Sequence, residues 1–390
     1  MRRLNVGLAV GTVMVLGLAA CGGSGTSDGA ADGGGDSSAV VTEAKANVER
    51  NYAGTDRTLP TAAPEPPADK SVWVIVCSTS AEGCAEPGKG VVEASEALGW
   101  SAKLVDGKLD PGTFNSSIRS AVAAKADAIV LVSVDCALTK ASIEAAQEQG
   151  VLVGGLYALD CDDEYAGGGD PLFDFELTYG DGQGYGDFLG GEYSASIADY
   201  AIAKTDGKAK VVAVRQNDVA SVRHVGDGFV DRMKDCSTCE VTSVEITNAD
   251  LLGGKIQGKV QTALTQNPDA DVVFAPYDAS ISLGVAAGVK ASGRDGQILL
   301  VGGEGLTPNI EMIASGSGQD FAAGAPARWA GWAATDELIR AFAGEPMVDE
   351  GIGVLSIDAD HNLPTKTSFY DGNPASDYES NFRSIWGLGE

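Results

Sequence analysis

Polar and aromatic side chains that could bind a small molecule follow several short apolar runs of this sequence. Each run is typical of a buried parallel strand, and ligands of open parallel sheets bind beyond the carboxyl ends of the strands. Aromatic faces can stack on a ring, and acidic or guanidinium groups can form paired hydrogen bonds with hydroxyl groups. The candidates are Ser78, Ser80, Glu82, Asp135 and Tyr157 in the first part of the chain, and Arg223, Tyr277, Asp278 and Glu304 in the second.

Three of these candidates also have ordinary structural explanations. Tyr157 could belong to the core, and Asp135 could cap the helix that follows it. Arg223 follows the apolar run Val211–Val214 and a polar loop, and it begins a helix in which Phe229 and Met233 share a face. This order directs Arg223 towards a ligand position, but a solvated arginine at a helix start has the same pattern.

The cysteines predict disulfides in an exported protein. The chain has seven cysteines, and six remain when Cys21 is set aside. An even number favours disulfides, and proximity in the sequence favours the pairs Cys77–Cys84, Cys136–Cys161 and Cys236–Cys239. Cys136 and Cys161 follow strands that would be neighbours about 5 Å apart.

A redox centre or a metal site is a weaker interpretation of the same cysteines. Cys236 and Cys239 form a Cys-x-x-Cys motif, but a reactive thiolate needs a helix N-terminus to lower its pKa. Cys236 instead follows the predicted helix that starts near residue 222. His224 and His361 are the two histidines, too few to suggest a zinc site beside the cysteines. We expect neither a metal nor another cofactor.

The N-terminus has the features of a bacterial lipoprotein signal. Arg2 and Arg3 precede the apolar run Val6–Leu16, which is too short to span a bilayer, and Leu18-Ala19-Ala20-Cys21 follows. We expect residues 1–20 to be removed and Cys21 to carry the lipid that anchors the protein to the outer face of the cell membrane. A secretory signal with a coincidental cysteine is the alternative. Residues 21–69 are rich in Gly, Ser, Asp, Ala and Pro, which predicts a flexible acidic tether.

Composition and periodicity predict a two-lobed α/β protein. The chain has 390 residues and a net charge of −28, and the lack of a basic tract argues against nucleic acid as a partner. Apolar runs at 72–76, 102–105 and 128–132 alternate with helical patterns, as do runs at 211–214, 241–246, 272–275 and 298–301. Alternation of this kind predicts two doubly wound parallel sheets.

The stretch KVVAVRQNDVASVRHVGDGF at 210–229 resembles the sugar-type, ribose-binding-like periplasmic solute-binding proteins of ABC importers. Ala126–Val130, Val272–Asp278 and Val301–Gly305 match the same family in the expected order, and the resemblance covers roughly residues 70–360. It implies crossings between the lobes near 158–175, 324–326 and 345–352. The N-terminal lobe would then comprise 70–157 and 327–350, and the C-terminal lobe 158–326 and 351–390.

The family resemblance also implies a function. The protein would be a monomer that closes about a hinge on a small solute, most simply a sugar, and delivers it to a permease; it would not be an enzyme. Arg223 would contact the solute. Other positions depart from the family pattern: Tyr157-Ala158 replaces Asp-Arg, Tyr277-Asp278 replaces Asn-Asp, Gly303-Glu304 replaces Phe-Asp, and Gly324 replaces a Gln.

These departures favour a larger, flatter or partly apolar solute over a simple pentose or hexose. The predicted binding residues are Ser80, Asp135, Tyr157, Arg223, Tyr277, Asp278 and Glu304. An aromatic or nucleoside-like solute, or a sensory receptor with the same fold, are the alternatives. An exported thiol-redox or hydrolytic enzyme is disfavoured because its motifs are missing from the sequence.

Overall fold

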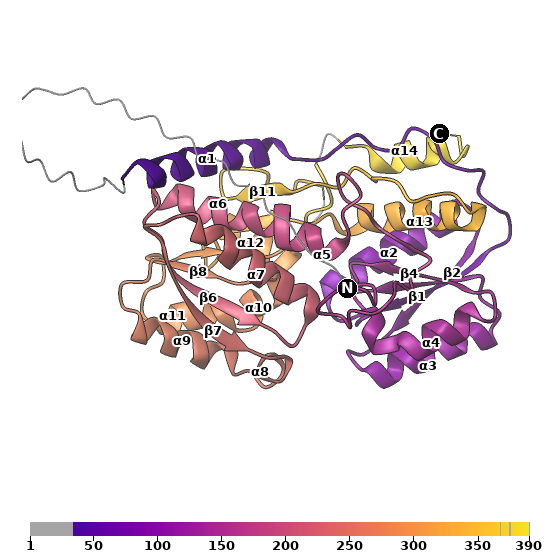
Figure 1. Ribbon diagram of the computed structural model, residues 1–390, viewed down its shortest axis with the longest axis horizontal. Coiled ribbons are helices and arrows are strands. Elements are labelled where there is room, and N and C mark those ends of the chain that lie inside the picture. Colours follow the sequence, from indigo (N-terminus) through magenta and orange to yellow (C-terminus); the bar gives the residue numbers. More distant parts are fainter. Residues whose placement is uncertain (1–33, 367, 374–375, 390) are drawn as a thin grey trace, which may run out of the picture.

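The computed structural model describes residues 34–366, 368–373 and 376–389, which form two α/β lobes side by side (Figure 1). The predicted signal peptide and Cys21 lie outside the described residues. Among the helices of the described part, none combines the length and the apolar character needed to cross a membrane.

The N-terminal lobe is built on a parallel sheet of five strands in the order β2-β1-β3-β4-β5. Strand β3 is buried along its whole length because helices cover both faces of the sheet. In Figure 1, α3 and α4 lie on one side of the sheet, and α2 and α13 lie on the other. The strands are β1 (Ser71–Val76), β2 (Ser101–Asp106), β3 (Ala128–Val132), β4 (Leu152–Leu156) and β5 (Phe175–Glu176), and the helices are α2 (Glu82–Ala97), α3 (Pro111–Ala123), α4 (Cys136–Gln147) and α13 (Ala327–Ala343).

Two glycines allow α2 and α13 to pack with their backbones almost in contact. A Cβ atom on Gly90 would lie 2.5 Å from the carbonyl oxygen of Arg328, and one on Gly331 would lie 2.5 Å from that of Pro87. Any larger residue at either position would push the helices apart. The close packing fixes the start of α2, and with it one wall of the space between the lobes.

The C-terminal lobe is built on a six-stranded sheet in the order β11-β10-β9-β8-β6-β7, parallel except for the antiparallel pair β10 and β11. The strands are β6 (Lys210–Gln216), β7 (Glu240–Ile246), β8 (Val272–Phe274), β9 (Leu299–Val301), β10 (Phe321–Gly324) and β11 (Leu355–Asp358). The helices are α5 (Tyr185–Phe188), α6 (Ser194–Lys204), α7 (Ala220–Lys234), α8 (Asn248–Leu252), α9 (Ile256–Gln266), α10 (Asp278–Ser280), α11 (Ala286–Ala291) and α12 (Thr307–Ser315), with π-helical turns η1 (Leu189–Tyr193) and η2 (Ile281–Val285). The predicted fold of two doubly wound lobes is confirmed.

The segment predicted as a flexible tether is structured from residue 34 onwards, and this part of the prediction is corrected. Helix α1 (Gly34–Ala53) lies along α6 of the C-terminal lobe (Figure 1), with Ala44 and Val48 buried. The Asn47 amide donates a hydrogen bond of 2.7 Å to Asp199 of α6. Beyond α1 the chain runs past the hinge to β1. Just before β1, the Pro67 carbonyl accepts a hydrogen bond of 2.7 Å from the Trp100 indole, which holds this segment on the N-terminal lobe. A short stripe of apolar residues in α1 is therefore buried against α6, although the segment as a whole is polar.

The first crossing between the lobes lies later than the predicted 158–175. The Cys136–Cys161 disulfide and the pairing of β5 with β4 keep the loop that follows β4 on the N-terminal lobe. The chain crosses after β5, where Thr178 forms a parallel bridge with Asp349 of the third crossing. Residues 158–176 therefore belong to the N-terminal lobe, because the disulfide holds them there.

The C-terminal tail returns to the N-terminal lobe, which corrects the assignment of 351–390 as a whole to the C-terminal lobe. Helix α14 (Tyr378–Ile385) packs on α13, and the Trp386 ring stacks on that of Trp332 with centroids 5.5 Å apart. The Trp386 indole donates to Asp336 at 2.6 Å. The aromatic residues at helical spacing in α14 thus match an aromatic face of α13.

Two further segments therefore accompany the predicted hinge strands. The Arg57 N–H donates to the Gly351 carbonyl at 2.8 Å, so the N-terminal segment runs beside the third crossing. The tail is held on both sides of the hinge, since the Tyr370 N–H donates to Gly305 at 2.7 Å and Asp371 accepts from the Arg328 N–H at 2.6 Å. The hinge is broader than the three strands expected from the sequence.

All three predicted disulfides are present in the structure. Their Cα–Cα distances are 5.7 Å for Cys77–Cys84, 5.0 Å for Cys136–Cys161 and 5.3 Å for Cys236–Cys239. Each bond lies within one lobe, so none of them restricts the hinge. Cys236 follows the C-terminus of α7, the helix pole that does not activate a thiolate.

Candidate functional site

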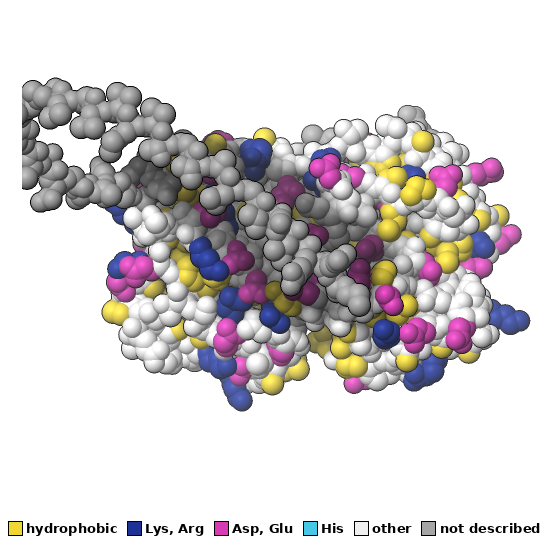
Figure 2. Space-filling model, in the orientation of Figure 1, with side chains coloured by type: hydrophobic (Ala, Val, Ile, Leu, Met, Phe, Trp, Pro, Cys, Tyr) yellow, Lys and Arg dark blue, Asp and Glu magenta, His cyan; other side chains and the backbone are white. Residues whose placement is uncertain are grey.

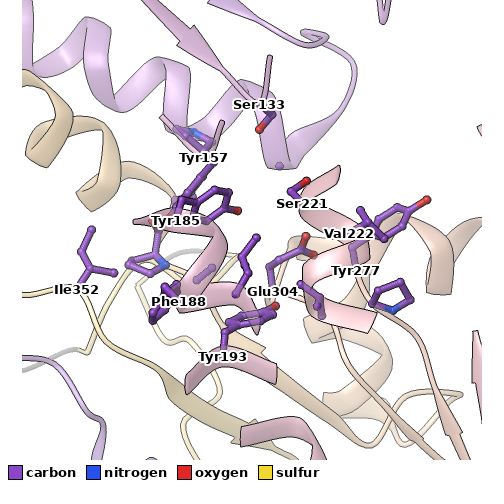
Figure 3. Close-up of a pocket in the computed structure, with 18 of the residues that line it drawn as sticks. Ser133, Tyr157, Tyr185, Phe188, Tyr193, Ser221, Val222, Tyr277, Glu304 and Ile352 are labelled. Carbon is purple, nitrogen blue, oxygen red and sulfur yellow. Dashed lines mark hydrogen bonds between the residues drawn. The ribbon is translucent and has the colours of Figure 1, made fainter. Parts of the chain in front are cut away.

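A cavity of about 100 Å³ lies between the lobes at the carboxyl ends of their strands (Figure 3). It has room for a few water molecules or a small ligand. Its walls are mostly apolar, and the aromatic residues among them are Tyr157, Tyr185, Phe188, Tyr193 and Tyr277. Ser133, Ser221 and Glu304 add polar groups.

Tyr157 forms the N-terminal lobe's part of the aromatic wall. It follows β4 with a positive φ of 51°, which turns its side chain out of the sheet. Its hydroxyl donates to the Pro326 carbonyl at the second crossing, at 2.7 Å. Its ring lies 5.5 Å from that of Tyr185. The predicted candidate is therefore in the cavity and is anchored to the hinge.

The C-terminal lobe's tyrosines are also held by hydrogen bonds to the protein. Tyr277 follows β8, and its hydroxyl donates to the Gln216 side chain at 2.6 Å. The Tyr193 hydroxyl donates to the Gly303 carbonyl at 2.9 Å. Figure 3 shows the Tyr277 hydroxyl directed away from the centre of the cavity. These two rings therefore supply fixed apolar surface, and their hydroxyl protons are already in use.

Glu304 lies at the centre of the cavity (Figure 3), on the loop that follows β9. Gly303 and Gly305 have φ angles of 90° and 88°. Residues with a side chain rarely adopt such angles, so glycine is needed on both sides of Glu304. One carboxylate oxygen accepts the Asp278 N–H at 2.8 Å. Burial raises the pKa of Glu304 to about 7. A carboxyl group with this environment is poised between its neutral and charged forms at neutral pH.

Asp278 supports Glu304 from below and does not line the cavity. It is fully buried, and its carboxylate accepts the Leu306 N–H at 2.6 Å. Burial, with the nearby charge of Glu304, raises the pKa of Asp278. Its place in the structure is therefore that of a support for the loop at 304–306.

The other predicted residues lie at or beyond the edge of the cavity. Ser80 is exposed and hydrogen-bonds to Ser78 at 2.8 Å. Asp135 is half-buried, accepts the Leu159 N–H at 3.0 Å, and makes no side-chain hydrogen bond that caps α4. Burial raises the pKa of Asp135 to about 6. Neither residue is among those that line the cavity.

Arg223 lies at the rim and not in the cavity. Its guanidinium stacks over the Tyr165 ring at 3.8 Å, and its side chain is 43% exposed. Its Nε lies 3.5 Å from Asp227, which also accepts a hydrogen bond from the Tyr165 hydroxyl at 3.0 Å. Because Tyr165 belongs to the N-terminal lobe, this arginine forms a contact between the lobes.

The lobes touch at both rims, so the structure is a closed form. At one rim the Asp163 carboxylate lies 2.8 Å from His224 of α7. At the other, Glu82 at the start of α2 accepts the Thr307 N–H at 3.1 Å and its hydroxyl at 2.5 Å. We call the Glu82–Thr307 contact the rim latch. Glu82, named from the sequence as a cleft residue, therefore acts between the lobes.

Sequence reasoning missed three aromatic residues of the cavity: Tyr185, Phe188 and Tyr193. They occupy α5 and η1, directly after the first crossing. Tyr185 lies within a glycine-rich stretch, which does not by itself indicate a helix. The signal was a cluster of aromatic residues at helical spacing in a chain with few of them.

One group of potential metal ligands occurs among the described residues: Cys136, Asp160 and Cys161. Both sulfur atoms belong to a disulfide, and the Asp160 carboxylate accepts the Leu172 N–H at 2.9 Å. This group is therefore occupied by structural bonds.

Residues 72–346 match the model of the periplasmic binding protein domain family. The match covers well over half of the chain, and the chain therefore belongs to this family. No curated protein matches the sequence.

Solved structures with the same fold include several sugar-binding proteins. A solute-binding protein from Agrobacterium vitis with bound allitol is 15% identical, with a TM-score of 0.60 over 75% of this chain and 96% of that one. One from Actinobacillus succinogenes with bound D-allose is 16% identical, with a TM-score of 0.62 over 75% and 98%. A glucose-galactose binding protein from Geobacillus stearothermophilus is 16% identical, with a TM-score of 0.62 over 77% and 100%. At these identities the likeness concerns the fold.

Proposed function

We propose that this protein is the extracytoplasmic receptor of an ABC importer, which captures a small solute between its lobes and delivers it to the permease. One observation carries the proposal. A cavity walled by side chains of both lobes lies beside a hinge, and the rims are joined by hydrogen bonds that a small rotation would break. Ligand capture by closure about a hinge uses such an arrangement.

The solute in this proposal is a sugar or a sugar-like molecule, since the similar structures named above hold allitol and D-allose. Tyr157, Tyr277 and Glu304 are the sequence-predicted residues that contact it. Ser80, Asp135, Arg223 and Asp278 act from outside the cavity. The aromatic walls also favour the alternative of an aromatic or nucleoside-like solute.

Binding without chemical conversion is the proposed activity. Of the described residues lining the cavity, none is a histidine, cysteine or lysine, the usual bases and nucleophiles. Glu304 is the one carboxylate in that lining, whereas hydrolysis of glycosides generally needs a pair. The receptor works as a monomer in this proposal, and a sensory partner in place of a permease is the second possibility.

A panel of solutes tests the receptor role. The purified protein is screened by thermal shift against sugars, polyols, nucleosides and aromatic acids, and hits are measured by titration calorimetry. We expect at least one compound to raise the melting temperature, because a ligand that binds only the folded form stabilises it. We also expect small-angle scattering to show no expansion of the liganded protein relative to this closed form. A panel without any hit would speak against the receptor role.

The proposal includes lipid anchoring at Cys21. The sequence of the signal supports it, as does the acidic character of the chain, whose net charge is −28 and which would be repelled by anionic lipid. Cys21→Ser should move the protein from the membrane fraction to the soluble fraction. Retention of the variant on the membrane would show that another feature provides the anchor.

A further inference from the structure

The charged groups of the cavity are unbalanced. Glu304 is the one acidic residue in the described lining, and none of the lining residues is Lys, Arg or His. Arg223, the cation expected from the sequence, is held at the rim by Tyr165 and Asp227. A buried carboxylate usually has a positive partner, because an unpaired charge is costly to remove from water. The cavity therefore holds a carboxyl group that is partly ionised at neutral pH and has no positive partner among the described residues that line the cavity.

The hydrogen-bonding groups of the cavity are also unbalanced. The hydroxyl protons of Tyr157, Tyr193 and Tyr277 are donated to protein oxygens. The Tyr277 hydroxyl is directed away from the cavity, whereas the hydroxyls of Tyr157 and Tyr193 can only accept from a ligand. An ionised Glu304 can likewise only accept. Ser133, Ser221 and Tyr185 remain as side chains that can donate. The cavity offers more acceptors than donors, so it suits a ligand that donates hydrogen bonds or carries positive charge.

The negative field of Glu304 reaches the aromatic rings around it. Burial, followed by the charge of Glu304, raises the pKa of Tyr185, Tyr193 and Tyr277. Figure 3 shows Glu304 between Tyr185, Ser221 and Tyr277. Aromatic faces attract organic cations through their quadrupole, and this attraction grows when water is excluded. A carboxylate among aromatic rings thus combines two features that recognise a positive nitrogen.

We infer that the solute carries a positively charged nitrogen, as a protonated amine or a quaternary ammonium, which binds beside Glu304 among Tyr185, Tyr193 and Tyr277. This inference rests on the proposed receptor function and specifies its ligand. An amino sugar would keep the sugar-like body, and a compact aliphatic ammonium ion would suit the apolar walls. Anionic solutes are excluded by the same field.

Matched pairs of ligands test the inference. Titration calorimetry at pH 7, where the amine of glucosamine is mostly protonated, compares glucosamine with glucose, and choline with its uncharged carbon analogue 3,3-dimethylbutan-1-ol. We expect at least one cation to bind at least tenfold more tightly than its neutral counterpart. Preference for glucosamine identifies an amino sugar site, and preference for choline identifies a quaternary ammonium site.

Variants then locate the charge. Glu304→Gln keeps the shape of the side chain and removes its charge, so we expect it to lower the affinity for the preferred cation at least tenfold. Glu176→Gln, which removes a carboxylate of β5 outside the cavity, should leave that affinity unchanged. If choline is preferred, its binding should strengthen about tenfold from pH 6 to pH 8, because the pKa of Glu304 is about 7, and Glu304→Gln should abolish this trend.

The outcomes separate this inference from the receptor function. Equal or tighter binding of a neutral member of each pair overturns the inference, and so does binding of neither cation. Binding of glucose or another neutral solute from the wider panel would at the same time uphold the receptor role. Unchanged cation affinity in Glu304→Gln would also overturn the assignment of the charge to this residue.

Discussion

The rim latch between Glu82 and Thr307 should control how often the empty protein closes. Its two hydrogen bonds join the start of α2 in one lobe to the start of α12 in the other. Opening the hinge breaks both bonds and exposes their atoms to water. Glu82→Ala removes the acceptor of both bonds without touching the residues that line the cavity.

The size of the effect follows from the chemistry of the latch. A hydrogen bond to a charged group contributes roughly 1.5–3 kcal/mol, but these two share one half-exposed carboxylate that water can solvate in the open form. A net stabilisation of about 1–2 kcal/mol for the closed form is therefore reasonable. This corresponds to a ratio of closed to open forms about 5-fold to 30-fold higher than without the latch, and to a solute affinity higher by up to the same factor.

Scattering and calorimetry measure this effect. Glu82→Ala should increase the radius of gyration of the solute-free protein and weaken the binding of the solute found by the panel. Thr307→Val, which removes the hydroxyl donor and keeps the backbone N–H, should act in the same direction with a smaller effect, and the double variant should be little worse than Glu82→Ala alone. Glu96→Ala, which removes an exposed carboxylate from the same helix, is the control. Full additivity of the two substitutions, or unchanged closure in both, would refute the latch.

Three further predictions follow from other parts of the structure. Burial raises the pKa of Glu337 to about 8 and also raises that of Glu350, its hydrogen-bonded neighbour at the third crossing. The folded protein therefore holds protons that the unfolded chain releases above the ordinary pKa of glutamate. The melting temperature should rise as the pH is lowered from about 8 to about 5, and it should rise less steeply in Glu337→Gln. A decrease of the melting temperature over this range would contradict the assignment. Ala44→Glu places a charge in the buried contact of α1 with α6 and should expose residues 34–53 to limited proteolysis, while equal protection in variant and wild type would show that α1 is held by other contacts. Arg223→Ala should weaken solute binding less than tenfold, because the arginine acts through the rim, whereas the direct contact expected from the sequence would cost tenfold to a hundredfold in calorimetry.

The parts of the fold that local sequence determines were predictable. The all-apolar run of β3 and the motif around residues 210–229 indicated buried parallel strands and the family. Helix α1 was missed because its composition is that of a linker, and the stripe formed by Val41, Ala44 and Val48 becomes meaningful only when α6 is there to receive it. The position of the tail could not be predicted either, since a docking face on α13 is a tertiary property.

The candidate site likewise has one part that could be predicted from the sequence and one part that could not. Strand ends placed Tyr157, Tyr277 and Glu304 correctly in the cavity, because the end of a buried strand can be located from the sequence. The direction in which a long side chain points cannot be predicted from the end of a strand. Arg223 turns towards Tyr165, which comes from a loop that the Cys136–Cys161 disulfide holds on the other lobe. The sequence predicted this loop in the C-terminal lobe, so a contact of Arg223 with a ring across the lobes could not be expected.

The return of the tail to the first lobe has a consequence for the order in which the chain can fold. Trp329 and Trp332 of α13 are covered by Tyr378 and Trp386, which lie almost at the end of the sequence. A chain that leaves the cell N-terminus first must keep this aromatic surface uncovered until residues 378–386 have emerged. The lobe that starts first can therefore finish folding only after residues 378–386 have emerged, and a chain truncated before residue 378 would expose an aromatic face to aggregation and proteolysis.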